Sequence, residues 1–227
     1  MNLLGAFQFL TVLPIRSSSS QSGPAALWFP LVGALLGLAA ATPCVWLPAQ
    51  GPLLALALVA LLTGGLHEDG LADVCDALRA HRSREKMLAI LHDSRIGAHG
   101  AAGFVFSLLI RWQALGQIHG DLWLRLPAAY AFSRGAMVLM AAVLPAVGEG
   151  LGRHFKNTLP RSAVVLVALQ CAGLCYVLGP IVLAAQVLLL AIAGRWFYSR
   201  LGGATGDCLG FTCQLSEATS LVVLAAL

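Results

Sequence analysis

Four carboxylates are crowded into one short stretch of this sequence. Glu68, Asp69, Asp73 and Asp76 lie within nine positions, although the 227 residues include only ten acidic ones. On a helix, where each residue turns by about 100°, the three aspartates share a face roughly 60° wide with Glu68 at its flank. Like charges at these spacings repel unless a cation neutralises them, and Mg2+ prefers carboxylate and phosphate oxygens. The stretch therefore predicts a phosphate-directed magnesium site of Asp69, Asp73 and Asp76, with a solvated helix face as the alternative.

Two further segments have residue types that suit an anionic ligand. Ser94 and Arg95 precede an apolar segment, and free N–H groups and the dipole at a helix start attract phosphate, to which an arginine adds bidentate contacts. Residues 202–210 hold four glycines with Thr205 and Asp207, and glycines let a backbone approach a ligand closely. Simple helix capping for the first segment and a flexible turn for the second are the alternatives.

The composition indicates where these residues must lie. Apolar residues make up 59% of the chain and charged residues 11%, whereas soluble domains have roughly 45–50% and about 25%. A net charge of only +4 and long uncharged stretches exclude an ordinary soluble enzyme, a disordered chain and a nucleic-acid binder. The sequence predicts an all-α, polytopic membrane helix bundle in the lipid bilayer, forming a single domain over residues 1–227.

Spanning helices need about 20 mostly apolar residues, and the sequence offers six or seven. Met1–Leu13 is short and is predicted to lie in the interface or to re-enter the membrane. The segment Ser162–Ala193 is long enough for two helices broken at Gly179-Pro180. The other predicted spans are Ala25–Leu47, Pro52–Leu66, Ala98–Ile118, Leu122–Val147 and Phe211–Leu227.

Basic residues give the predicted orientation. They occur in alternate connections, in residues 79–95, 153–161 and 195–200, and loops kept in the cytoplasm are enriched in Lys and Arg. We therefore expect a multi-pass membrane protein whose acidic stretch faces the cytosol. Arg134 lies near the middle of its apolar segment, where a charge is costly unless paired. It is therefore predicted to be a functional residue, with a salt bridge that only orients helices as the alternative.

Several motifs, in this order, resemble the adenosylcobinamide-GDP ribazoletransferase family, also called cobalamin-5'-phosphate synthase. The most specific are the acidic run from Gly64 to Asp76 and the segment Thr205-Gly206-Asp207-x-Leu209-Gly210. The others are Phe7-Gln8-Phe9-Leu10-Thr11, Leu13-Pro14, Phe29-Pro30-Leu31-Val32-Gly33, Asp93-Ser94-Arg95-Ile96-Gly97 and Ser133-Arg134. The resemblance covers the chain from end to end.

The resemblance implies a reaction and a set of roles. A hydroxyl of α-ribazole, or of its 5'-phosphate, would attack the cobinamide-linked phosphorus of adenosylcobinamide-GDP, and GMP would leave, with Mg2+ as the cofactor. Asp69, Asp73 and Asp76 would bind the metal, and Glu68 or Asp207 would act as the base. The residues expected to bind substrate are Ser94, Arg95, Arg134, Thr205 and Gly206. The oligomeric state, including a homo-oligomer, stays open.

Three other classes of protein fit less well. A CDP-alcohol phosphotransferase would share the opening Asp69-Gly70-Leu71-Ala72, but it would have an arginine at Asp73 and a downstream D-x3-D that this sequence lacks. A UbiA-type prenyltransferase would have two acidic motifs, whereas the Asp207 region has one aspartate. A transporter would place acids at mid-depth along a path, whereas most acids here flank the spans.

Overall fold

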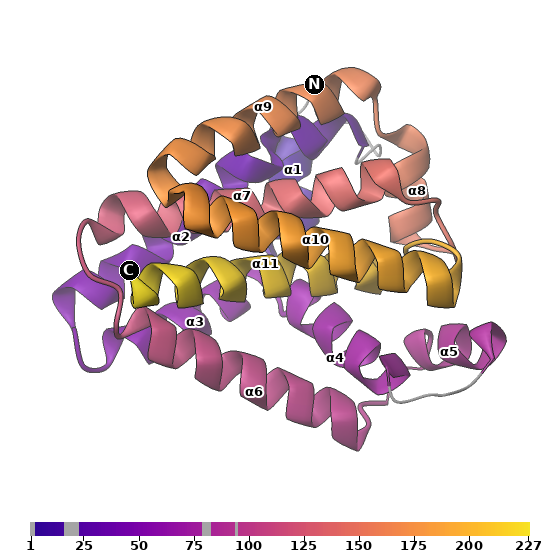
Figure 1. The fold of residues 1–227 in the computed structure, drawn as a ribbon, viewed down its shortest axis with the longest axis horizontal. Coiled ribbons are helices and arrows are strands. Elements are labelled where there is room, and N and C mark those ends of the chain that lie inside the picture. Colours follow the sequence, from indigo (N-terminus) through magenta and orange to yellow (C-terminus); the bar gives the residue numbers. More distant parts are fainter. Residues whose placement is uncertain (1–2, 16–22, 79–82, 94) are drawn as a thin grey trace.

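The computed structural model describes residues 3–15, 23–78, 83–93 and 95–227, and these form the helical bundle of Figure 1. The predicted all-α class is confirmed, since the regular elements in these ranges are all helices. Their bounds are α1 Leu3–Leu10, the 3-10 helix η1 Gly23–Trp28, α2 Phe29–Trp46, α3 Gly51–Thr63, α4 Leu66–Leu78, α5 Arg84–Leu91, α6 Ala98–Leu115, α7 Leu122–Val143, α8 Leu151–Thr158, α9 Arg161–Leu178, α10 Pro180–Leu201 and α11 Gly206–Ala226.

Five helical stretches in the described part of the chain are long and apolar enough to cross a membrane. They are Gly23–Trp46, Leu122–Val143, Arg161–Leu178, Pro180–Leu201 and Gly206–Ala226. The pair α3 and α4 makes a sixth if it is taken as one broken span. The multi-pass prediction and the break at Gly179 are confirmed. The predicted span Pro52–Leu66 is wrong as a separate crossing, because α3 has 13 residues and a helix rises about 1.5 Å per residue.

The turn between α3 and α4 brings the acidic stretch into the bundle. Gly64 and Gly65 both have positive φ angles, 65° and 71°, which glycine adopts without steric cost. The two helix axes differ by 95° as a result. Glu68 and Asp69 then fall in the first turn of α4, where the helix dipole favours negative charge.

Helix α4 crosses the start of α11 at two glycines. A Cβ atom added to Gly70 would lie 2.8 Å from the backbone oxygen of Asp207, and one added to Gly210 would lie 3.4 Å from the Cα atom of Gly70. A side chain at Gly70 would therefore force the two helices apart, whereas at Gly210 the added atom would lie at the limit of ordinary van der Waals contact. The crossing therefore joins the acidic stretch to the Thr205-Gly206-Asp207 segment, which follows far later in the chain.

A short backbone pairing holds the entrance to α11 in place. Ala146 and Ala204 form a parallel bridge, in which Val147 N donates to Ala204 O at 3.0 Å and Ala204 N donates to Pro145 O at 2.9 Å. This ties the segment after α7, the most deeply buried span, to the residue before Thr205. Helices α5 and α8 and the start of α11 gather at the right-hand end of the bundle in Figure 1.

Candidate functional site

A cavity of about 510 Å3 opens at this end of the bundle. Helices α1, α4, α8 and α11 supply most of its wall, with the end of α5 and one residue of α7. Its polar lining consists of Gln8, His67, Asp69, His92, Glu149, His154, Thr205 and Asp207. Its apolar lining includes Phe9, Leu66, Leu91, Met137, Leu151, Phe155 and Leu209. The cavity thus combines a carboxylate side with an aromatic side.

Asp69 and Asp207 are the two predicted aspartates that both line the cavity. Asp207 lies in the first turn of α11, and Thr205 caps that helix. The Thr205 hydroxyl donates to Asp207 Oδ2 at 3.2 Å and accepts from the backbone N–H of Cys208 at 3.3 Å. Thr205 therefore fixes both the helix start and the Asp207 carboxylate, and Gly206 beside it also lines the cavity.

Asp73 is half-buried, one turn beyond Asp69 on α4. It is not among the residues that line the cavity. Its carboxylate is nevertheless within electrostatic range of four others, those of Asp69, Asp207, Asp76 and Asp93. The fold thus gathers carboxylates from α4, from α11 and from the segment after α5, which is the arrangement that a cation would relieve.

Asp76 has partners of another kind. Its Oδ2 accepts the backbone N–H of Gly97 at 2.7 Å, and its Oδ1 accepts that of Gly100 at 2.8 Å. Both carboxylate oxygens therefore satisfy free N–H groups at the start of α6. The prediction placed Asp76 with Asp69 and Asp73 as a metal ligand, whereas in the structure Asp76 joins α4 to α6.

The Arg95 side chain is not among those that line the cavity. Ser94 lies outside the described residues. The Arg95 side chain is 87% exposed and pairs with Asp93, with 2.7 Å between Nη2 and Oδ2. Hydrogen bonds from Arg95 lower the pKa of the Asp93 carboxyl to about 2. The contacts of Arg95 are therefore those of an exposed surface pair, and the N–H groups at the start of α6 donate to Asp76 and not to a side chain of this motif.

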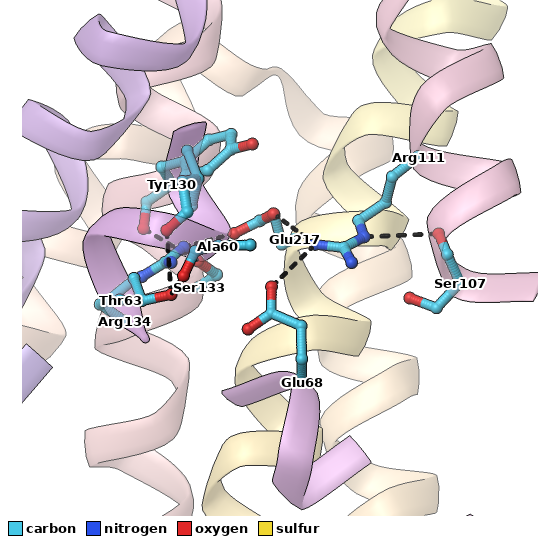
Figure 2. Close-up of polar contacts among 10 residues, drawn as sticks. Ala60, Thr63, Glu68, Ser107, Arg111, Tyr130, Ser133, Arg134 and Glu217 are labelled. Atoms are coloured by element: carbon cyan, nitrogen blue, oxygen red, sulfur yellow. Dashed lines mark hydrogen bonds and ion pairs between the residues drawn. The ribbon is translucent and has the colours of Figure 1, made fainter. Parts of the chain in front are cut away.

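Arg134 and Glu68 belong to a charged network in the bundle interior, shown in Figure 2. Glu217 lies between two arginines: it pairs with Arg134, and its Oε1 is 3.1 Å from Arg111 Nη1. Glu68 Oε1 lies 3.7 Å from the same Arg111 nitrogen. Neither Arg134 nor Glu68 lines the cavity. For Arg134, the salt-bridge alternative matches the structure: its partner is Glu217, which also pairs with Arg111, and the sequence motifs indicated neither contact.

The sequence of this chain is similar to that of known proteins over nearly its whole length. Residues 2–225 match the family described as cobalamin-5-phosphate synthase. The chain belongs to this family. Three relatives are named adenosylcobinamide-GDP ribazoletransferase. That of Geotalea daltonii is 37% identical over 98% of this chain and 96% of its own. That of Bradyrhizobium diazoefficiens is 38% identical over 97% and 92%, and that of Herpetosiphon aurantiacus 38% over 100% and 96%. No solved structure matches this chain.

Membership in the cobalamin-5-phosphate synthase family confirms the resemblance drawn from the motifs. It makes the chain a transferase of cobamide biosynthesis, and it does not favour the phosphotransferase and transporter alternatives. The motifs did not predict the aromatic wall of the cavity. Phe155 of α8 stacks on Phe29 at 5.4 Å and on Phe9 at 5.6 Å between ring centroids.

Five polar cavity residues were also missed as site residues: Gln8, His92, Glu149, His154 and the buried His67. The amphipathic helix α8 could have been predicted, because Leu151 and Phe155 lie four residues apart in an otherwise polar segment. The histidines gave no such signal, since a single histidine in a loop or at a membrane boundary carries little information without its neighbours.

Proposed function

We propose that this chain transfers the cobinamide-phosphate group of adenosylcobinamide-GDP to α-ribazole or its 5'-phosphate and releases GMP. The name of its relatives supports the substrates. The observation that carries the site is the meeting of Asp69 and Asp207 in one cavity, produced by the α4 and α11 crossing. A cavity of about 510 Å3 has the size of an ordinary small-molecule site.

The proposed reaction is a displacement at phosphorus. The ribazole hydroxyl oxygen forms a bond to the cobinamide-linked phosphorus, the bond from that phosphorus to the bridging oxygen breaks, and the oxygen leaves with GMP. The hydroxyl proton passes to a base. Asp207 is the better base of the two predicted, because it faces the cavity and is hydrogen-bonded only by Thr205 among the described side chains. Glu68 instead faces Arg111 in the interior.

Magnesium is the cofactor that the carboxylates fit best. No three His, Cys, Asp or Glu side chains in the described ranges stand close enough to hold one metal ion between them. Mg2+ does not need three, because one or two carboxylates, waters and substrate phosphates usually complete its coordination. Asp69 and Asp73 would hold the ion, since both donors are oxygen and their mutual repulsion favours a cation. When bound, the ion would neutralise charge on the diphosphate.

The site is proposed to face the cytosol of a bacterial inner membrane. Basic residues border the cavity end of the bundle: Arg84 and Lys86 on α5, and Arg153 and Lys156 on α8. Cytoplasmic loops are enriched in such residues, and a nucleotide-bearing substrate would arrive from that side. Lys156 also donates to Ala142 O at 2.6 Å, which holds α8 against the end of α7.

The test is turnover by the purified full chain in liposomes. Adenosylcobinamide-GDP, α-ribazole and Mg2+ are added, and GMP and the cobamide product are followed by chromatography and mass spectrometry. We expect GMP and product in equal amounts, both depending on all three additions. GMP formation without a cobamide product would indicate hydrolysis, and no GMP at all would contradict the proposal. Substrate flux into sealed liposomes without chemistry would favour a transporter.

A further inference from the structure

A groove between two membrane spans lies apart from the cavity. It has a volume of about 350 Å3 and runs between the C-terminal halves of α7 and α10. None of its lining residues also lines the cavity. The groove opens outward, because Val143 on one side is 80% exposed and Tyr198 on the other is 57% exposed. Since both helices are long and apolar enough to span a membrane, the opening faces the lipid.

The groove is apolar over most of its length. Apart from Arg195 and Tyr198, its lining side chains are apolar, among them those of Leu139 and Met140. Gly194 is also one of the lining residues, and a Cβ atom added to it would lie 3.4 Å from Met140 Sδ. An apolar hollow of this kind does not hold water, and protein interiors are otherwise closely packed. Hydrocarbon is therefore the occupant that the surroundings offer.

Arg195 gives one end of the groove a positive charge. It lies in the last two turns of α10, which ends at Leu201, and so roughly 9 Å from that end at 1.5 Å per residue. From such a depth a long basic side chain reaches the level of the lipid headgroups. No carboxylate pairs with Arg195 in the part of the chain that the structure describes, and an unpaired charge within a span is costly. A lipid phosphate can supply the counter-ion, because guanidinium binds phosphate through two parallel hydrogen bonds.

We propose that this groove binds an anionic phospholipid, with one acyl chain along Leu139 and Leu190 and the phosphate on Arg195. The charged end of the groove points toward the cavity end of the bundle, because α7 and α10 both run that way in Figure 1. That end is the one proposed to face the cytosol, and the cytoplasmic leaflet carries anionic lipids. A bound lipid would also join α7 to α10 just before the pairing of Ala146 with Ala204, and so support the entrance to α11.

Native mass spectrometry of the purified full chain in detergent measures this binding. The protein is freed of co-purified lipid and titrated with phosphatidylglycerol or with phosphatidylcholine of the same acyl chains. We expect the first phosphatidylglycerol to bind about fivefold more tightly, since one basic residue near a membrane surface contributes about that much toward an anionic lipid. Phosphatidylglycerol should also raise the melting temperature, because a ligand that binds only the folded state stabilises it.

Two variants test the two parts of the groove. Arg195→Gln should abolish the preference for phosphatidylglycerol and leave the affinity for phosphatidylcholine unchanged. Gly194→Leu should weaken the binding of both lipids several-fold, because the added side chain occupies the groove. Its melting temperature without lipid reports whether it folds, and Arg195→Gln decides the matter if it does not. The matched control is Arg161→Gln, an exposed basic residue at the start of α9 and outside the groove, which should keep the preference.

Three results would overturn the inference. The first is an equal affinity of the wild type for the two lipids. The second is an equal loss of preference in Arg195→Gln and Arg161→Gln, which would indicate a diffuse attraction to basic residues in general. The third is a lipid-free dimer that Gly194→Leu dissociates, which would assign the groove to a second copy of this chain. GMP release is not part of the test, so its result is independent of the proposed reaction.

Discussion

Helices α4 and α11 each place carboxylates in two different environments. Asp69 and Asp207 line the cavity, and the carboxylates around them are brought together. Glu68 and Glu217, on the same two helices, face inward to Arg111 and Arg134. The interior charges are balanced, whereas the acids at the cavity have no matching cation among the residues that the structure describes. A charge that the fold has neutralised holds helices together, and one that the fold has left open is available to a ligand.

The largest expected effect comes from the cavity side. Asp207→Asn should lower kcat for GMP release by about 100-fold or more, because a positioned base contributes roughly 100- to 10,000-fold. Its melting temperature should stay close to that of the wild type, since Asn still accepts the Thr205 hydrogen bond. The matched control is Asp121→Asn at the exposed turn before α7. Full activity of Asp207→Asn would remove the residue from the chemistry.

Substitutions in the interior network should lower the stability of the fold, in contrast to those at the cavity, which should lower activity. Glu217→Gln leaves Arg134 buried without its counter-ion, and we expect the free energy of unfolding to fall by about 3–5 kcal/mol. The double variant Arg134→Met with Glu217→Gln restores the charge balance and should recover part of this loss. Melting curves in detergent measure both, with the exposed Glu85→Gln on α5 as control. Equal stability of Glu217→Gln and the wild type would show that the network does not contribute this free energy to folding.

Substitutions of Asp69 and Asp76 compare, within helix α4, a carboxylate at the cavity with one that is already bound by backbone N–H groups. Asp69→Asn should raise the Mg2+ concentration for half-maximal GMP release several-fold, because a carboxylate ligand is lost. Asp76→Asn should leave that concentration unchanged and lower the unfolding free energy by about 1 kcal/mol, the usual size of a helix N-terminal contact. The same Mg2+ shift in both variants would return Asp76 to the metal site.

One added methyl group at Gly70 should push apart helices α4 and α11, whose crossing forms the cavity. Gly70→Ala would place a Cβ atom 2.8 Å from Asp207 O, and overpacking of this kind costs about 1–3 kcal/mol. We expect lower activity together with a lower melting temperature. Gly173→Ala on α9 has no atom within 4 Å of the added Cβ and should be neutral or slightly stabilising. Equal behaviour of the two variants would contradict the close crossing.

The surface pair Arg95 and Asp93 should matter least. Arg95→Ala should change the KM of adenosylcobinamide-GDP less than twofold and leave the melting temperature unchanged, because exposed pairs are screened by solvent. The Asp93 pKa should rise from about 2 toward its ordinary value near 3.9. A depressed pKa in the folded state stabilises only above the unfolded pKa, so any contribution is lost as pH falls from about 4 to 2. NMR titration measures it, and a large KM change would return Arg95 to the substrate site.

The helix α4 could be predicted from its sequence, but the helices that pack against it could not. The spacing of the acidic residues indicated a helix, which the structure has as α4. The break at Gly179-Pro180 also follows from local residue preferences. The split between Asp69 at the cavity, Asp76 on α6 and Glu68 in the interior depends on which helices pack against α4. The 13-residue α3 shows the same limit, since hydropathy does not reveal a 95° bend.

The sequence by itself determined that this chain is a multi-pass membrane protein and that it belongs to a cobamide-forming family, and it predicted that the chemistry lies in the Asp69 and Asp207 segments. Composition, periodicity and motif order are local properties, and each is written in the residues. Only the tertiary structure decided that Asp76 binds the start of α6, that Arg134 pairs with Glu217, and that His67 lines the cavity. Whether a charge is neutralised or left open depends on side chains from distant segments, and only packing brings those together.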